Sequence, residues 1–348
     1  MDAAAGAPPA AAGRTAARAL PPLLAVAHGS TDPRAAATIA ALMRLAGQLA
    51  GRNGLPALDA RTAYLGHSPP SVSQVLGALA APDPGPAARE RRIVVLPLLL
   101  TAAYHSEIDL PALLADAAGA HPGLRLSYGD PLGPHPLLLG VLDRRLAERG
   151  APAARATTNP GITQPAGPVP AAGRFCYAGP LPGQPAGQLP DAHAGPLAAA
   201  RSGSPSGRPD APLPGAPGDI AVVLASAGSR HPAANAAIAG IAARWQARAG
   251  WRAVVPAYAA AGSPTPAEAV SALRRGGAPA VVVATYLLAP GRFAYQVAES
   301  SLAAGAAAVS GALGAAPEVA RLVLLRYAAA VARPGRMAGA WQGISASR

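Results

Sequence analysis

The sequence has no lysine, a single cysteine and few aromatic residues. With Cys176 alone, neither a disulfide framework nor a cysteine-cluster metal site can form within the chain. Because no apolar run reaches the roughly 18 residues that a membrane helix needs, we expect no transmembrane helix. Met1–Leu20 also lacks the basic start and compact apolar block of a secretory signal. These absences predict a soluble, cytoplasmic protein.

The chain has a net positive charge, and arginine is its only basic residue type apart from histidine. All 29 basic residues are arginine, against 17 acidic residues, so the formal net charge is +12. The arginines are scattered, and aromatic residues make up only 4% of the chain, which argues against a nucleic-acid partner. Scattered arginines suit a small polyanionic ligand, because a guanidinium group binds a carboxylate through paired hydrogen bonds.

Composition divides the chain into two blocks of similar length. The segment 151–217 is dominated by Ala, Pro, Gly, Ser and Thr and has no periodic apolar face, so we predict a disordered linker there. Residues 1–20 and 333–348 are predicted to be disordered tails for the same reason. The remaining blocks, 21–150 and 218–332, are expected to fold as domains.

Each block alternates short, continuously apolar runs with Ala-rich stretches of helical periodicity. In the first block we expect strands at Leu23–His28, Ala57–Leu65, Ile93–Leu100 and Leu124–Tyr128, with helices at Pro33–Arg52, Pro70–Ala81, Ile108–Ala120 and Pro134–Arg149. In the second block we expect strands at Ile220–Ala225, Ala253–Tyr258 and Ala280–Leu288, with helices at Pro232–Arg248, Pro264–Arg275 and from Phe293 onward. Apolar strands separated by helices predict an α/β fold with a doubly wound parallel sheet.

The two blocks also match each other in sequence. Ala27–Pro33 (AHGSTDP) corresponds to Ser226–Pro232 (SAGSRHP), and Ile93–Leu100 (IVVLPLLL) corresponds to Val281–Leu288 (VVVATYLL). The order of the expected strands and helices is the same in both blocks. We therefore predict two tandem, duplicated domains with a ligand-binding cleft between them.

Three histidines of the first block follow expected strand ends. His28 ends the first strand, His67 follows the second by two residues, and His105 lies just after the third. Ligands of open α/β sheets collect beyond the carboxyl ends of the strands, so these imidazoles can face one another. Histidines without a thiolate favour a divalent metal such as Fe, Co, Ni or Zn. Glu107 and Asp109 stand near His105 and could orient it or share a proton.

The second block lacks all three imidazoles. At the corresponding positions it has Ala227, Ala261 and Phe293. Histidines that served only packing would be expected to recur in both copies, so their joint loss favours one asymmetric site in the first block. A strand-end histidine can also be a core or capping residue, and each of the three histidines keeps that alternative.

The remaining candidate residues are expected to have no catalytic role. His121 and His135 precede prolines in loop-like contexts and are expected to be solvated, while His193 and Cys176 lie in the predicted linker. The chain has no glycine-rich phosphate-binding motif and no nucleophile-elbow serine motif, which disfavours nucleotide-binding and esterase functions.

Three segments carry a resemblance to a known family. They are LLAVAHGSTDPRA (Leu23–Ala35), VVLPLLLTAAYHSEIDLPALL (Val94–Leu114) and GDPLGPHPLL (Gly129–Leu138). The chain resembles the sirohydrochlorin chelatases, the cobalt- and iron-inserting enzymes of the class II chelatase superfamily, in their long two-domain form. The resemblance implies an ATP-independent lyase that inserts Co²⁺ or Fe²⁺ into sirohydrochlorin, a macrocycle with eight carboxylates, in cobalamin or sirohaem biosynthesis. This sequence departs from the family pattern at His67, where members commonly carry glutamate.

The resemblance also implies which residues act. In the family, the histidines that match His28 and His105 bind the metal, and one of these or Glu107 would accept the pyrrole protons. We expect the substrate to be contacted also by Ser30, Arg34, His67, Arg230 and Arg292. The divalent metal is a substrate, and we expect no organic cofactor, no nucleic-acid or membrane partner, and a monomer whose two domains imitate a dimer.

Two other functions remain open from the sequence. A protoporphyrin-type ferrochelatase could use the same fold, although the chain lacks an apolar membrane-contacting lip. A metal or tetrapyrrole carrier would bind at the same site without inserting the metal.

Overall fold

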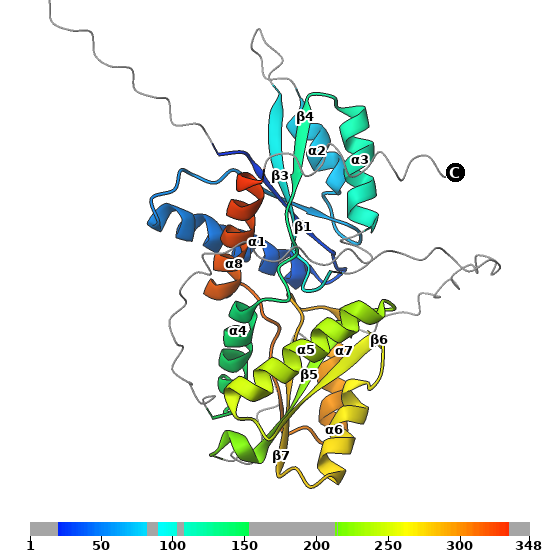
Figure 1. Ribbon diagram of the computed structural model, residues 1–348. Helices are drawn as coiled ribbons and strands as arrows, with labels where there is room; N and C mark the ends of the chain where they lie inside the picture. The colour runs from blue at the N-terminus through cyan, green and yellow to red at the C-terminus, as the bar shows by residue number, and fades with distance from the viewer. Residues whose placement is uncertain (1–19, 82–89, 103–107, 153–212, 214, 334–348) are drawn as a thin grey trace, which may run out of the picture.

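The computed structural model describes residues 20–81, 90–102, 108–152, 213 and 215–333 (Figure 1). Most of both predicted tails and of the predicted linker lies outside the described residues. So do the candidate site residues His105 and Glu107, and so do Cys176 and His193.

Each half of the chain forms a parallel four-stranded sheet. The first sheet has the order β2-β1-β3-β4, with β1 (Leu23–Ala27), β2 (Ala60–Tyr64), β3 (Arg91–Pro97) and β4 (Leu124–Tyr128). The second has the matching order β6-β5-β7-β8, with β5 (Ile220–Gly228), β6 (Ala253–Ala261), β7 (Ala280–Thr285) and β8 (Ala308–Val309). The predicted α/β fold of two tandem parallel sheets is confirmed. The two-residue strand β8 was not predicted, because so short a run carries no periodicity.

Eight named helices cover the sheets in the described part of the chain. They are α1 (Pro33–Arg52), α2 (Val72–Ala80), α3 (Leu110–Ala120), α4 (Pro136–Ala147), α5 (Pro232–Ala249), α6 (Pro266–Arg275), α7 (Arg292–Ala303) and α8 (Pro317–Ala332). Asp32 caps α1 by accepting the Arg34 N–H, and Ser71 forms a capping box with Gln74 at α2. Within the described residues, no helix is both long and apolar enough to cross a membrane.

The outer face of each sheet has its own apolar core. Leu24 and Val26 of β1 pack with buried residues of α2 and α3, and Ala221 and Val223 of β5 pack with buried residues of α6 and α7. The inner faces behave differently. Leu23 of β1 belongs to the same buried cluster as residues of β5, so one core joins both halves.

This shared core is built by an exchange of helices. Helix α8, from the second half, packs against α1 and β3 of the first half, and α4, from the first half, packs against β7 of the second. Figure 1 shows α8 beside α1 in one half and α4 beside α5 in the other. Tyr327 of α8 is 4% exposed, and its hydroxyl donates to the Pro21 carbonyl at 2.6 Å. Burial raises the pKa of the Tyr327 hydroxyl to about 12.

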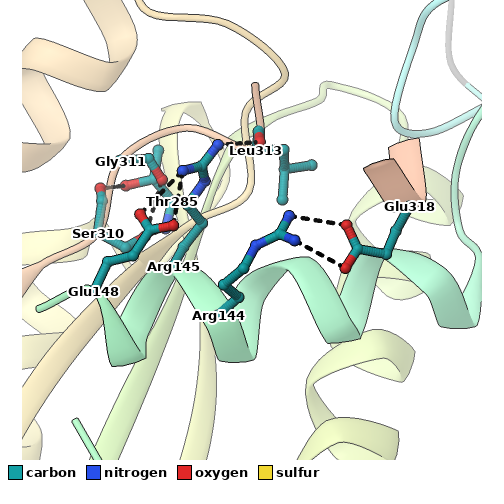
Figure 2. Close-up of polar contacts among 8 residues, drawn as sticks. All are labelled: Arg144, Arg145, Glu148, Thr285, Ser310, Gly311, Leu313 and Glu318. Atoms are coloured by element: carbon teal, nitrogen blue, oxygen red, sulfur yellow. Dashed lines mark hydrogen bonds and ion pairs between the residues drawn. The ribbon is translucent and has the colours of Figure 1, made fainter. Parts of the chain in front are cut away.

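Polar contacts fix the exchanged helices where they cross (Figure 2). Arg144 of α4 donates to both carboxylate oxygens of Glu318 in α8, at 3.0 and 2.8 Å. Next to it, Arg145 binds the carboxylate of Glu148 and also donates to the Leu313 carbonyl at 2.9 Å. Bidentate pairing sets the direction of approach as well as the distance, so the crossing angle of the two helices is specified.

The exchange corrects two boundaries predicted from the sequence. The helix predicted at Pro134–Arg149 begins at Pro136 and covers the second sheet, although it belongs to the first block in sequence. Ala151 and Pro217 were assigned to the disordered linker, but both are buried. The linker prediction was therefore wrong at these two residues, and Ala151 belongs to the shared core.

We expect neither half to be stable alone. Without the second half, the apolar surface of α1 and β3 that α8 covers is exposed to water. Val319, Leu322, Val323 and Tyr327 are the large buried side chains of α8, and at roughly 2 kcal/mol for each the lost burial is about 8 kcal/mol. This loss lies within the roughly 5 to 15 kcal/mol by which a domain is typically stable. Residues 20–152 expressed alone should lack cooperative thermal unfolding by circular dichroism, and co-expression with residues 213–348 should restore it.

His135 gives the fold a dependence on pH. Its Nδ1 accepts the Leu137 N–H at the start of α4, at 3.2 Å, which requires an unprotonated ring. Burial, together with the charge of Arg326, lowers the pKa of His135. The prediction that His135 is solvated was therefore wrong, because the histidine before Pro136 serves as the helix cap.

Since the pKa of His135 is lower in the folded state, the unfolded chain takes up a proton first as the pH falls. The cap is then fully effective above about pH 6.5 and is lost below it, at a cost of about 1 kcal/mol. His135→Asn keeps a capping oxygen that does not titrate in this range. We expect the melting temperature of the wild type to fall more steeply than that of His135→Asn between pH 7.5 and 5, and parallel curves would contradict this role.

Candidate functional site

The carboxyl edge of the first sheet carries two closely joined loops. His28 follows β1, and its carbonyl accepts the Gly66 N–H of the loop after β2 at 3.1 Å. The Ser68 hydroxyl donates to the Ser30 carbonyl at 2.7 Å and accepts the Ser30 N–H at 3.2 Å. These bonds hold the loop of His28 against the loop of His67.

Gly29 makes this approach possible. Its φ is +92°, and a Cβ at this position would lie 1.7 Å from the Gly66 carbonyl oxygen. No other residue can take that place without moving the backbone. Gly228 repeats the arrangement in the second half, with φ of +80° and a hypothetical Cβ 2.1 Å from the Ala261 carbonyl oxygen. The frame of the site is thus present twice.

His28 and His67 lie side by side on this frame. Their ring centroids are 6.2 Å apart and the rings are inclined by only 18°. Both side chains are exposed, and His67 has a φ of +61°, a left-handed conformation that is uncommon outside glycine. Nδ1 of His28 lies 3.4 Å from the Gly29 carbonyl oxygen. With the proton on Nδ1, the ring is in the tautomer in which Nε2 can serve as a metal ligand.

A pocket of about 450 Å³ opens beside the two rings. Its lining is His28, Leu65, Gly66, His67, Asp109, Ala112, Leu113 and Asp116. The last four residues are related by spacings of three and four, so they share one face of α3, with Asp109 at its N-cap. This face lies beside the strand ends that carry the histidines. The pocket therefore combines imidazole nitrogens with carboxylate oxygens, the ligands of borderline divalent metals. Among the described residues, no group of three or more His, Cys, Asp or Glu side chains forms a complete metal site.

The other predicted site residues that the structure describes do not line this pocket, apart from His67. Arg34 binds the carboxylate of Asp32 through Nε and Nη2, at 3.0 to 3.1 Å and 2.7 Å, and this hydrogen bonding lowers the pKa of Asp32. The Ser30 hydroxyl oxygen accepts the Asp32 N–H at 3.1 Å, so it helps to shape the loop. Arg230 and Arg292 are exposed and lie in the second half. Arg34 thus binds Asp32, the residue that caps the start of α1.

Asp116 was missed by the sequence analysis. It follows Asp109 by seven residues, two turns of helix, and the same spacing could have indicated a shared face. The missing step was to place α3 beside the loop after β2, which lies far away in the sequence. In the second half, Asn235 joins the corresponding loops, because its side-chain amide donates to the Ser229 carbonyl at 2.8 Å and to the Ala261 carbonyl at 3.5 Å.

The two halves meet close to this site. The Tyr286 hydroxyl, at the end of β7, donates to the Leu100 carbonyl after β3 at 3.3 Å. Gly291, before α7, lies so near Ser30 that a Cβ would be 3.1 Å from the Ser30 hydroxyl oxygen. The carboxyl edges of both sheets therefore face the same region.

The CbiX family is identified by a match over both halves, at residues 22–149 and 221–330. The chain belongs to the CbiX family. Both matched segments coincide with the two sheets and their helices, and the resemblance seen in the sequence is confirmed. This CbiX chain carries its histidine pair in the first of the two matched segments only.

Curated relatives match over shorter segments. The chain is 34% identical over 89 residues to the sirohydrochlorin cobaltochelatase of Priestia megaterium, a segment that covers 26% of this chain and 27% of that protein. It is 35% identical over 60 residues to the sirohydrochlorin ferrochelatase of Bacillus subtilis (strain 168), covering 17% of this chain and 23% of the relative. These alignments thus span about a quarter of the curated relatives.

Solved structures match over most of the chain. SirB from Bacillus subtilis with Fe³⁺ superposes with a TM-score of 0.61 at 19% identity, covering 90% of this chain and 96% of SirB. The sirohydrochlorin chelatase SirB from Bacillus subtilis subspecies spizizenii, in complex with cobalt, gives a TM-score of 0.58 at 18% identity, covering 91% and 97%. At this identity the likeness establishes the shared two-domain fold.

Gly29→Ala should damage both the fold and the site. The added Cβ meets the Gly66 carbonyl and the backbone is left-handed, so we expect a loss of about 3 kcal/mol or more in the free energy of unfolding. Gly54→Ala is the matched control, because Gly54 also has a positive φ, +72°, but has nothing within 4 Å of its Cβ position. It should cost only about 1 kcal/mol. Equal losses in urea unfolding would contradict the close approach.

Proposed function

We propose that this CbiX chain is a sirohydrochlorin chelatase that inserts Co²⁺ or Fe²⁺ into the macrocycle. The observation that supports this most is the pocket beside His28 and His67, with Asp109 and Asp116 opposite, at the carboxyl edge of the first sheet. Curated relatives bear both metal names, a cobaltochelatase and a ferrochelatase, and both metals accept imidazole and oxygen ligands. The proposal therefore covers both.

A chelatase must release the metal that it binds. A small set of imidazole and carboxylate ligands with open coordination positions suits this better than a closed cage of four ligands. We assign His28 and His105 as the metal ligands. In the sequence, His105 and Glu107 stand between β3 and α3, and α3 contributes Ala112, Leu113 and Asp116 to the pocket.

Insertion also requires that two pyrrole protons leave the macrocycle. A base must stand near the ring nitrogens, and we assign this role to Glu107, with His28 or His105 able to accept a proton when the metal has left it. Metal binding requires unprotonated imidazole, so the same side chains couple metal release to proton uptake. No organic cofactor is needed for this exchange of ions.

The function is tested by mixing purified protein with sirohydrochlorin and either Co²⁺ or Fe²⁺, without oxygen for iron, and following the absorption spectrum. We expect many turnovers per protein molecule. His28→Ala and His105→Ala should each lower the rate by about 100-fold, because each removes a metal ligand, and His67→Ala by about tenfold.

His231→Ala is the matched control. His231 stands before α5 in the second half, is exposed, and makes no side-chain capping bond. We expect its rate to stay near that of the wild type. A spectral change that stops at one equivalent would instead indicate a carrier, and turnover of protoporphyrin but not of sirohydrochlorin would indicate a ferrochelatase of the other type.

A further inference from the structure

The first turn of α7 exposes an aromatic side chain, and this turn follows Gly291, which lies near Ser30 of the other half. Tyr295 is 54% exposed, the highest value among the large exposed hydrophobic residues of the described chain. Large apolar groups left in water at the edge of a ligand site often contact the ligand. The neighbouring Phe293, 39% exposed, occupies the position that corresponds in sequence to His105.

The spacing of Tyr295 from Gly291 relates it to the end of α7 that lies near the first half. The Tyr295 N–H donates to the Gly291 carbonyl at 3.0 Å, which places it one turn above Gly291. Gly291 in turn lies against Ser30, two residues after His28. Phe293 is two residues from Tyr295 and therefore points to a different side of the helix.

Arg292 adds a positive charge to the side that Tyr295 occupies. The two residues are three apart, a spacing that puts side chains on the same helix face. Arg292 is exposed, and it has no carboxylate partner within the ranges that the structure describes. An aromatic ring beside an unpaired guanidinium group is complementary to a flat macrocycle with carboxylates around its rim.

We propose that Tyr295 and Arg292, from the half without the histidine pair, bind the tetrapyrrole: the tyrosine ring contacts the face of the macrocycle, and the arginine pairs with a rim carboxylate. This inference rests on the proposed function and extends it, because it assigns metal binding and macrocycle binding to different halves. The first half binds the metal, and the second half holds the macrocycle against it.

Binding of metal-free sirohydrochlorin to the full chain, titrated by the shift of its absorption spectrum, tests the division directly. Tyr295→Ala should raise the Kd about tenfold, while Tyr295→Phe, which keeps the ring, should stay near the wild type. Arg292→Ala should raise the Kd about threefold, and this loss should vanish at high salt. In the insertion assay, Tyr295→Ala should raise the KM for the macrocycle and leave kcat almost unchanged.

Two controls sharpen the result. Phe293→Ala removes an exposed ring from the same turn but from another side, and Leu325→Ala removes an exposed side chain of α8, 47% exposed, so both should bind the macrocycle like the wild type. The methyl ester of sirohydrochlorin lacks charged carboxylates, so Arg292→Ala should bind it as tightly as the wild type does, whereas Tyr295→Ala should still bind it weakly.

The outcomes separate the two proposals. If the wild type inserts metal but Tyr295→Ala binds the macrocycle normally, or if Phe293→Ala loses as much affinity as Tyr295→Ala, the Tyr295 subsite is wrong and the chelatase function stands. If the wild type neither binds nor metallates sirohydrochlorin, the proposed function fails, and this inference fails with it. Binding of Co²⁺ alone, measured by calorimetry, should be the same in Tyr295→Ala and the wild type, because the tyrosine belongs to the macrocycle side.

Discussion

The exchange of α4 and α8 is the constraint on which the rest of the molecule depends. Because each half covers the inner face of the other half's sheet, the inner faces share one apolar core. The bidentate pair between Arg144 and Glu318 then sets how the exchanged helices cross. With the core and the crossing fixed, the carboxyl edges of both sheets are held toward each other, and the contact between Gly291 and Ser30 follows. The proposed site, which draws on both halves, depends on this packing.

Within that frame, the two halves carry different chemistry on the same backbone. The first half presents imidazoles and carboxylates around a pocket, whereas the second presents a tyrosine and an arginine on the first turn of α7. An enzyme that joins a metal ion to a macrocycle needs two kinds of contact, polar ligands for the ion and a broad apolar surface for the ring. Duplication offers a route to both, since each copy can specialise while the shared core keeps them aligned.

The sequence predicted the strands and helices well because their signals are local. The helix Pro33–Arg52 and the strand Leu124–Tyr128 were predicted with their observed bounds. Pro33 marks a first helical turn, and the apolar residues of Leu124–Tyr128 alternate with polar ones. The helix exchange was not predicted, because the sequence of α4 shows that one face is apolar but not which of the two sheets that face covers. The same limit applied to Asp116, which joins the pocket only through the packing of α3 beside a distant loop.

The paired glycines Gly29 and Gly228 show how unequally the parts of such a site resist change. Replacing either glycine forces a Cβ into a neighbouring carbonyl, so the fold itself resists that substitution. His28 and His67 are exposed, and replacing them with small residues removes little buried surface. Decay of a duplicated site can therefore proceed one histidine at a time, through intermediates that remain folded. The backbone outline of a binding site then persists in a copy that has lost its ligands, and such an outline alone is weak grounds for assigning chemistry.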